Sequence, residues 1–138
     1  MIVLDSSFIV KLVIEEPEST LAEKTLIDLL EQGEEASTID IALAEALSAL
    51  WKHHITIKDI DEKTLKEAIT DLLNLWTKLN ILSTYELSLK AINIAITDNI
   101  IIYDALYIAA AIKYRAGLAT FDQKQREIAK KREIPIHP

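Results

Sequence analysis

The chain has 138 residues, half of them hydrophobic, a formal net charge of −7 and no cysteine. This length fits one domain, and the lack of cysteine excludes disulfides, thiolate zinc sites and cysteine nucleophiles. The acidic balance is unfavourable for nucleic-acid binding, which usually depends on Lys and Arg, unless bound cations or a local basic cluster reverse the sign.

The first predicted element is a short strand followed directly by a helix. The continuous apolar run Ile2–Leu4 is typical of a strand that is buried on both faces of a parallel sheet. Ser6 or Ser7 can cap the helix that follows, and the Glu-Glu-Pro segment 15–17 ends it. The carboxylate of Asp5 therefore stands directly after a buried strand, where an unused charge is costly.

The rest of the chain alternates between helices and strands. A helix is expected around the leucines of 21–30, closed by Gly33, and later helices are expected over 40–54, 58–78, 86–97, 103–115 and 123–132. Short strands are expected over 35–39, 81–84 and 117–121, with a further edge strand over 134–137. This order predicts one α/β domain, residues 1–138, with a short and mostly parallel central sheet.

Four acidic residues fall where such a fold can bring them to one edge of the sheet. Asp5 and Asp122 each follow a predicted strand, Asp104 opens a helix, and Glu45 lies on a helix away from its strongly apolar face. Functional sites of open α/β sheets form beyond the carboxyl ends of the strands. Four like charges in one place would repel unless a cation held them, and oxygen ligands suit Mg²⁺ or Mn²⁺.

Each acid also has a simpler structural interpretation. Asp5, Asp104 and Asp122 could cap or favour helix N-termini, and Glu45 could be a solvated helix residue. The convergence of all four favours the metal site. The histidines offer no competing site, because two of the three are adjacent on a helix and cannot share a face, and the third is nearly terminal.

Basic residues near these acids could guide a phosphate backbone. Lys124 and Arg126 follow Asp122 directly, and Lys11 and Lys52 fall near the predicted site. The alternative for each is a solvated side chain on a helix surface.

No segment of the sequence indicates a membrane protein or a secreted one. The N-terminus lacks a basic region, and the longest apolar stretch, 100–112, contains Asp104 and is too short to span a bilayer. We therefore expect a cytoplasmic protein.

Four segments in this order resemble the PIN-domain family, and within it the VapC-type toxins of toxin–antitoxin systems. They are MIVLDSSFIVKLVIEEPES, AEALSALWK, YDALYIAAA and LATFDQK. The resemblance implies a three-layer α/β/α domain with a catalytic and metal-binding quartet at Asp5, Glu45, Asp104 and Asp122. One position departs from the family pattern, because Phe121 stands where a polar or basic residue is common.

The resemblance also implies an activity and partners. The activity is that of a Mg²⁺- or Mn²⁺-dependent endoribonuclease, in which metal-activated water hydrolyses RNA phosphodiesters. Ser6 and Thr120 would orient ligands or bound water, although helix capping or strand-end hydrogen bonding explains them equally well. The expected partners are RNA, a cognate VapB-like antitoxin gripped by a projecting pair of helices, and a second copy of the chain.

Rival assignments differ in the residues they need. A phosphatase of the haloacid dehalogenase type needs a second Asp at Ser7, and a receiver domain needs paired acids after the first strand and a Lys at the last strand. Neither pattern is present. A housekeeping RNA-processing PIN nuclease and a catalytically inactive PIN binding module remain as alternatives, and a neighbouring gene for a small basic antitoxin would favour the toxin.

Overall fold

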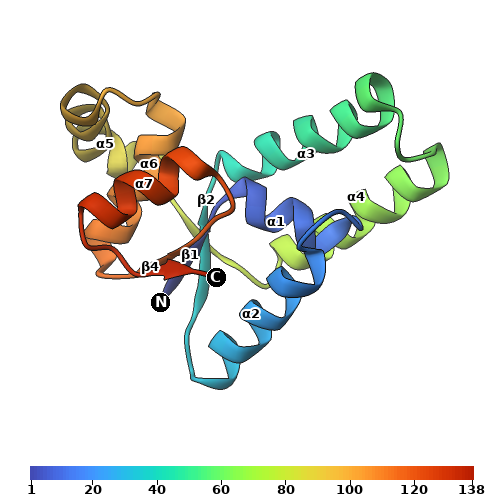
Figure 1. Ribbon diagram of the computed structural model, residues 1–138, viewed down its shortest axis with the longest axis horizontal. Coiled ribbons are helices and arrows are strands. Elements are labelled where there is room, and N and C mark those ends of the chain that lie inside the picture. The colour runs from blue at the N-terminus through green and yellow to red at the C-terminus, as the bar shows by residue number, and fades with distance from the viewer.

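The computed structural model describes all residues, 1–138, and has a parallel sheet at its centre (Figure 1). The strand order is β3-β2-β1-β4-β5, and every neighbouring pair is parallel. The strands are β1 (Ile2–Leu4), β2 (Ala36–Ile39), β3 (Asn80–Leu82), β4 (Gly117–Ala119) and β5 (Ile136–His137). The predicted α/β class and parallel sheet are confirmed.

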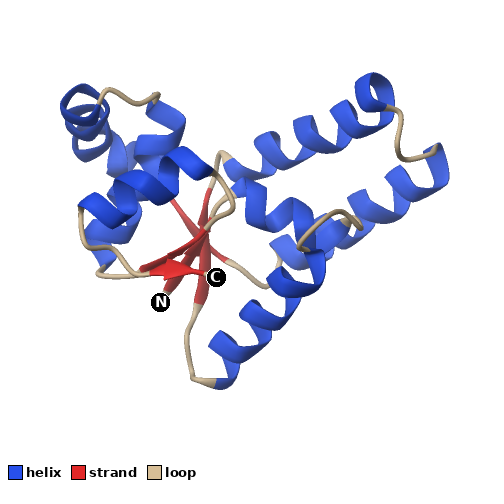
Figure 2. Cartoon of the chain, viewed as in Figure 1, coloured by secondary structure: helices blue, strands red, loops and turns tan.

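Helices cover both faces of this sheet, as Figure 2 shows. One layer holds α1 (Ser6–Val13), α2 (Ser19–Glu31), α3 (Ala42–Lys52) and α4 (Glu62–Trp76), with the short π-helical segment η1 (His53–Ile57) after α3. The other layer holds α5 (Thr84–Asp98), α6 (Ile102–Tyr114) and α7 (Gln123–Lys131). This is the predicted three-layer α/β/α arrangement.

The reversal of strand order between β1 and β4 determines where a site can form. The chain steps outward from β1 to β2 and β3 in one direction, then crosses back to β4 and β5 on the other side. Leu4 of β1 pairs with Ala119 of β4, so Asp5 and Thr120 are the next residues on neighbouring strands at the carboxyl edge. Crevices of this kind bind ligands in open α/β sheets.

Helix α6 forms the centre of the second layer. Seven consecutive residues, from Ala105 to Ala111, are buried, because α6 packs on β1, β2 and β4 and also against α5 and α7. Four of the seven are Ala, whose small side chain allows a helix to approach neighbours on every side. This packing fixes the position of Asp104 in the first turn of α6.

Several predicted boundaries were wrong by a few residues, and capping explains most of the differences. Helix α4 starts at Glu62 rather than near 58, because Lys58 adopts a left-handed conformation (φ 60°) and Asp61 caps the helix by accepting from Thr64 N–H. The strand expected over 81–84 ends at Leu82, since Ser83 caps α5.

The strand expected over 117–121 ends at Ala119, so Thr120 and Phe121 lie beyond it. The cap of α1 is Asp5, not Ser6 or Ser7. As a result, Thr120 and Phe121 lie at the carboxyl edge of the sheet instead of within β4. Ser6 and Ser7 lie in the first turn of α1 and leave the capping of that helix to Asp5.

Helices α3 and α4 form an arm that projects from the body and turns back through η1 (Figure 1). The core side of α3 consists of Ala42, Ala46 and Leu50. Leu47 and Trp51, which belong to its strongly apolar face in the sequence, are 37% and 57% exposed. Part of that apolar face is therefore surface rather than core.

No single helix is both long and apolar enough to cross a membrane. The bent pair α5 and α6, whose axes differ by 115°, meets the length and composition test only when the two helices are taken together.

Candidate active site

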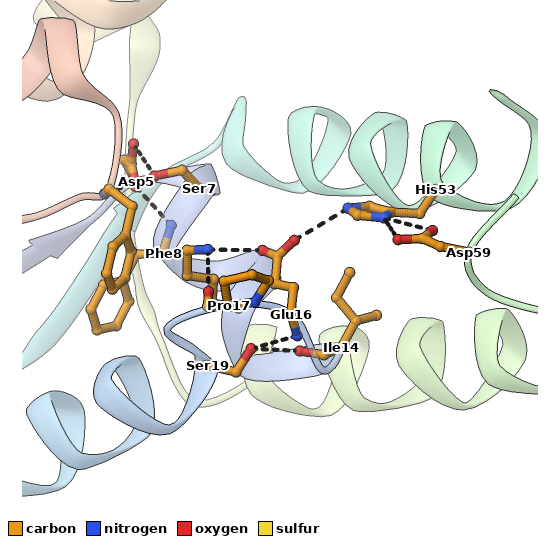
Figure 3. Close-up of polar contacts among 11 residues, drawn as sticks. Asp5, Ser7, Phe8, Ile14, Glu16, Pro17, Ser19, His53 and Asp59 are labelled. Carbon is orange, nitrogen blue, oxygen red and sulfur yellow. Dashed lines mark hydrogen bonds and ion pairs between the residues drawn. The ribbon is translucent and has the colours of Figure 1, made fainter. Parts of the chain in front are cut away.

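The carboxylate of Asp5 is the most completely held polar group at the carboxyl edge. Thr120 Oγ1 donates to its Oδ2 at 2.7 Å. Figure 3 shows the other two donors, Ser7 Oγ, which donates to Oδ1 at 2.7 Å, and Phe8 N–H, which donates to the same oxygen at 2.9 Å. Only 1% of the residue is exposed. Two of the donors come from the first turn of α1 and the third from the residue after β4, so this side chain, which itself follows β1, is fixed from both sides of the crevice.

Burial raises the pKa of Asp5 to about 6, although the hydrogen bonds from Thr120, Phe8 and Ser7 lower it in part. The negative charge of Asp122 adds to the upward shift. A buried carboxylate with a raised pKa beside a second acid has a strong affinity for positive charge.

Asp122 is joined to Asp5 through Thr120. The backbone N–H of Asp122 donates to Thr120 Oγ1 at 3.0 Å, while the same hydroxyl donates to Asp5. The side chain of Asp122 caps α7 by accepting from Gln125 N–H at 2.8 Å. The strand-end hydrogen bonding considered for Thr120 is therefore present, and it holds two of the four acids in register.

Glu45 reaches the same region from the first turn of α3. Tyr107 OH, from α6, donates to its Oε1 at 2.6 Å. Partial burial raises the pKa of Glu45, and the hydroxyls of Tyr107 and Ser6 lower it in part. Burial also raises the pKa of Tyr107, so its hydroxyl stays a donor. Glu45 is therefore held across the molecule by a residue 62 positions away.

Asp104 has one partner, Gln125 of α7, whose Nε2 donates to Asp104 Oδ1 at 3.1 Å. Gln125 is 3% exposed, and its Oε1 is the one buried side-chain polar atom without a hydrogen-bond partner. Partial burial raises the pKa of Asp104, with a further rise from Asp122 and an opposing effect from Gln125 and Lys124.

The four acids are brought into one electrostatic group. Asp122 raises the pKa of both Asp5 and Asp104, and Asp104 raises that of Glu45. No three of the Asp, Glu and His side chains are arranged around a common point as ligands of one ion. The structure thus places the acids within range of one another, and their role as metal ligands stays a prediction.

The chemistry of the donor set fits a hard divalent cation. The carboxylates of all four acids, the hydroxyls around Asp5 and the unpaired Gln125 oxygen are oxygen donors, which Mg²⁺ and Mn²⁺ prefer. None of the four acids forms a salt bridge with a Lys, Arg or His side chain. No basic side chain of the protein therefore neutralises this cluster by direct contact.

Two grooves open beside the group and meet at Ser6. One, of about 560 Å³, is lined on the α3 side by Ile41, Glu45, Ser48, Ala49 and Lys52, and across from them by Tyr103. The other, of about 490 Å³, contains Ser7, Lys11 and Asp122. The side of α3 that carries Glu45, together with Ile41, Ser48 and Ala49, therefore faces a groove rather than a neighbouring element.

The four basic residues considered for phosphate contact have different surroundings. Lys52 and Lys11 line the first and second grooves respectively. Arg126 donates to the backbone oxygens of Thr120 (3.0 Å) and Pro138 (3.1 Å), so it fastens the C-terminus to the end of β4. Lys124 is exposed and acts on Asp104 through its charge.

Three residues that hold the acids were not singled out from the sequence as functional: Ser7, Tyr107 and Gln125. Tyr107 lies three residues after Asp104 and Gln125 three after Asp122, which puts each one turn along the same helix. That spacing is the one sequence signal that could have identified them. The acids that the side chains of Tyr107 and Gln125 contact, Glu45 and Asp104, lie on other helices.

Comparison with known proteins identifies the family. Residues 2–131 match the PIN domain family model. Ribonuclease VapC3 of Pyrobaculum aerophilum is 30% identical over 126 residues, which cover 91% of this chain and 92% of that protein.

Solved structures agree with this match in fold. PAE2754 from Pyrobaculum aerophilum superposes with a TM-score of 0.67 at 18% identity, covering 98% of this chain and 82% of that one. VapBC2 from Rickettsia felis, bound to a DNA fragment from its promoter, superposes with a TM-score of 0.64 at 20% identity. The match covers 99% of this chain and 98% of that one. The protein described here belongs to the PIN-domain family.

Proposed function

We propose that this protein is a divalent-metal-dependent endoribonuclease with Asp5, Glu45, Asp104 and Asp122 as its reaction centre. The observation that carries the proposal is the coupling of four carboxylates, from four different elements, none of which forms a salt bridge with a basic side chain. The similarity to ribonuclease VapC3 over nine-tenths of the chain supports RNA as the substrate class.

Asp5 and Asp104, with Asp122 and Glu45, are the residues that would hold Mg²⁺ or Mn²⁺. When bound, such an ion lowers the pKa of its water and neutralises phosphate charge, which leads to hydrolysis of a phosphodiester. Thr120 and Ser7 keep the Asp5 carboxylate in one orientation, and Tyr107 does the same for Glu45. Fixed ligands avoid reorganisation at the moment of reaction.

The test is cleavage of total cellular RNA with Mg²⁺, Mn²⁺ or EDTA, with the fragment ends sequenced. We expect cleavage with either metal, none with EDTA, and loss of activity in Asp5→Asn although the variant stays folded by circular dichroism. Asp71→Asn, at an exposed acid on α4, is the matched control and should cleave like the wild type. Full activity of Asp5→Asn would refute the assignment.

The biological role that we propose is that of the toxin of a type II toxin–antitoxin pair, acting in the cytoplasm. VapBC2 of Rickettsia felis supports this role by its fold, and the projecting arm offers exposed apolar side chains to a protein partner, namely Trp51, Ile55, Ile57 and Leu73. Growth arrest on expression, relieved by the product of an adjacent antitoxin gene, tests the role. RNA cleavage without growth arrest would favour a housekeeping nuclease.

We further propose a homodimer that forms through the outer face of α5. Tyr85, Leu89, Ile92 and Ile96 recur at spacings of four and three residues and are 44–89% exposed, while Leu87, Ala91 and Ile94 on the opposite face are buried. This spacing is that of a coiled-coil seam, and the same stripe on a second copy is its natural complement.

The oligomeric state of a charge variant tests this interface. Leu89→Glu should convert the dimer to a monomer in light scattering, whereas Ser88→Glu, at an exposed neighbouring position, should leave it dimeric. A wild-type monomer at high concentration would contradict the interface.

A further inference from the structure

The second groove carries a charged cluster that the four acids do not use. It leads from Asp122 along α1 to three partly buried side chains, Lys11, Glu16 and His53. Their side chains are 13%, 19% and 16% exposed respectively. Partly buried charges need compensation, so the arrangement of these three determines what else the groove can bind.

Lys11 is held at the side of the groove by two contacts. Its Nζ donates to the backbone oxygen of Pro17 at 2.7 Å and lies 5.0 Å from the centre of the Phe121 ring. That ring stacks on Phe8, with 5.7 Å between the ring centres. The ammonium group is therefore preorganised, although Phe121 replaces the polar or basic residue expected at its position.

His53, the first residue of η1, is held from its other side. Its Nδ1 lies 2.9 Å from both carboxylate oxygens of Asp59, which accept a hydrogen bond from the N–H at this nitrogen. Its Nε2 consequently faces Glu16 Oε2 at 3.4 Å, as Figure 3 shows. Each ring nitrogen of His53 thus lies beside a carboxylate, Nδ1 beside Asp59 and Nε2 beside Glu16.

Glu16 bridges Lys11 and His53 without binding either tightly. Its Oε1 lies 3.4 Å from Lys11 Nζ and its Oε2 lies 3.4 Å from His53 Nε2. Charge-assisted hydrogen bonds normally measure about 2.7–2.9 Å, so both contacts are long. One carboxylate from the turn between α1 and α2 thus occupies a position where two donors meet.

We propose that Lys11 and His53 form a subsite for an RNA phosphate next to the one that is cleaved, and that Glu16 occupies this subsite in the free protein. This inference rests on the proposed ribonuclease function. A phosphodiester carries the same charge as the Glu16 carboxylate and has two free oxygens to accept from both donors. The groove connects the subsite to Ser6, Ser7 and Asp122, so one strand can reach both places.

Removing the charge of Glu16 is the direct test. Glu16→Gln should lower KM for a single-stranded RNA oligonucleotide about threefold with kcat unchanged, because the phosphate no longer displaces a carboxylate. Glu15→Gln is the matched control, since Glu15 is adjacent, exposed and of equal charge. Equal KM values for the two variants would overturn the subsite and leave the ribonuclease assignment intact.

Removing the cation should act in the opposite direction. Lys11→Ala should raise KM about tenfold, the size expected for losing one hydrogen bond to a charged group, with little change in kcat. The matched control is Lys66→Ala, at a lysine on α4 whose side chain is 74% exposed, and it should change neither KM nor kcat. If Glu16 had only a structural role, joining Lys11 of α1 to His53 of η1, Glu16→Gln would lower thermal stability and would not lower KM.

A second measurement does not depend on cleavage. Inorganic phosphate, titrated at constant ionic strength in metal-free buffer, should shift the ring NMR signals of His53 and leave those of His137 unmoved. The Kd should fall about threefold in Glu16→Gln, and the shift should vanish in Lys11→Ala. If phosphate did not move the His53 signals in Glu16→Gln, the subsite would be overturned even if the protein cleaved RNA. If phosphate shifted the His53 signals as expected but the protein did not cleave RNA, only the proposed ribonuclease function would be overturned.

Discussion

The four acids of the site are held in two different ways. Asp5 and Asp122 follow adjacent parallel strands, and one hydroxyl, that of Thr120, connects them. Glu45 and Asp104 lie on helices from opposite layers of the fold, and each has one principal side-chain partner, Tyr107 or Gln125. The strand half of the site is therefore held by backbone register and a shared hydroxyl, whereas each acid of the helix half is oriented by a single side-chain contact.

This difference has a consequence for metal binding. The strand half would offer a metal ion a fixed carboxylate of raised pKa, and Glu45 and Asp104 would add side chains that are each oriented by one principal contact. Removing contacts from the strand half should consequently affect stability and activity more than equivalent changes in the helix half.

The largest expected effect is a pH dependence that originates at Asp5. Its pKa of about 6 in the folded protein lies above the ordinary aspartate pKa of 3.8, so between these two pH values the folded state holds a proton that the unfolded state has released. Asp5 therefore favours folding fully below about pH 4, and this contribution is lost as pH rises through 6, on the order of 3 kcal/mol in all. Urea unfolding in EDTA from pH 4 to 7 measures it.

The control for this pH dependence is Asp5→Asn, which cannot titrate. Its free energy of unfolding should rise relative to the wild type as pH increases from 4 to 7. Parallel pH profiles for the two proteins would contradict the burial of an ionisable Asp5.

The next effect concerns the hydroxyl that connects Asp5 and Asp122. Thr120→Val keeps the shape but removes the donor to Asp5 and the acceptor for Asp122 N–H, both of them in a buried position. We expect a loss of about 2 kcal/mol in the free energy of unfolding and a fall in kcat of at least about tenfold. Thr70→Val, at an exposed helix position, should cost far less.

A smaller effect is expected for Tyr107→Phe in the helix half. The change removes the hydrogen bond to Glu45 and leaves the packing of the ring. Stability should fall by about 1 kcal/mol, and added Mn²⁺ should restore part of the lost activity by ordering Glu45. A larger loss of stability than that of Thr120→Val would contradict the division into two halves.

The smallest effect, and one of opposite sign, is expected for Asp104→Asn. Because Asp122 and Glu45 are electrostatically coupled to Asp104, removing its charge in metal-free buffer should raise thermal stability slightly, by less than about 1 kcal/mol given its partial exposure. In excess Mg²⁺ the wild type should instead be the more thermally stable of the two proteins. Unchanged or lower stability without metal would indicate that repulsion among the acids is weak.

The sequence predicted the strand half of the site better than the helix half, for a physical reason. Asp5 and Asp122 follow apolar strands, and parallel strands bring such positions to one edge whatever the rest of the chain does. The contact between Tyr107 and Glu45 joins residues 62 positions apart on helices of opposite layers, and no local pattern encodes it. Trp51 belongs to the apolar face of α3 by its spacing and is nevertheless exposed, because apolar periodicity does not distinguish a face in the core from an exposed apolar face.

The measurement that tests the central claim most directly is Mn²⁺ binding to the metal-free protein, followed by electron paramagnetic resonance. The wild type should bind Mn²⁺ with a Kd that rises at least about tenfold in Asp5→Asn and in Asp104→Asn, while Asp71→Asn binds like the wild type. Equal Mn²⁺ affinity in all four proteins would show that the acids do not share an ion, and the nuclease mechanism would then have no reaction centre.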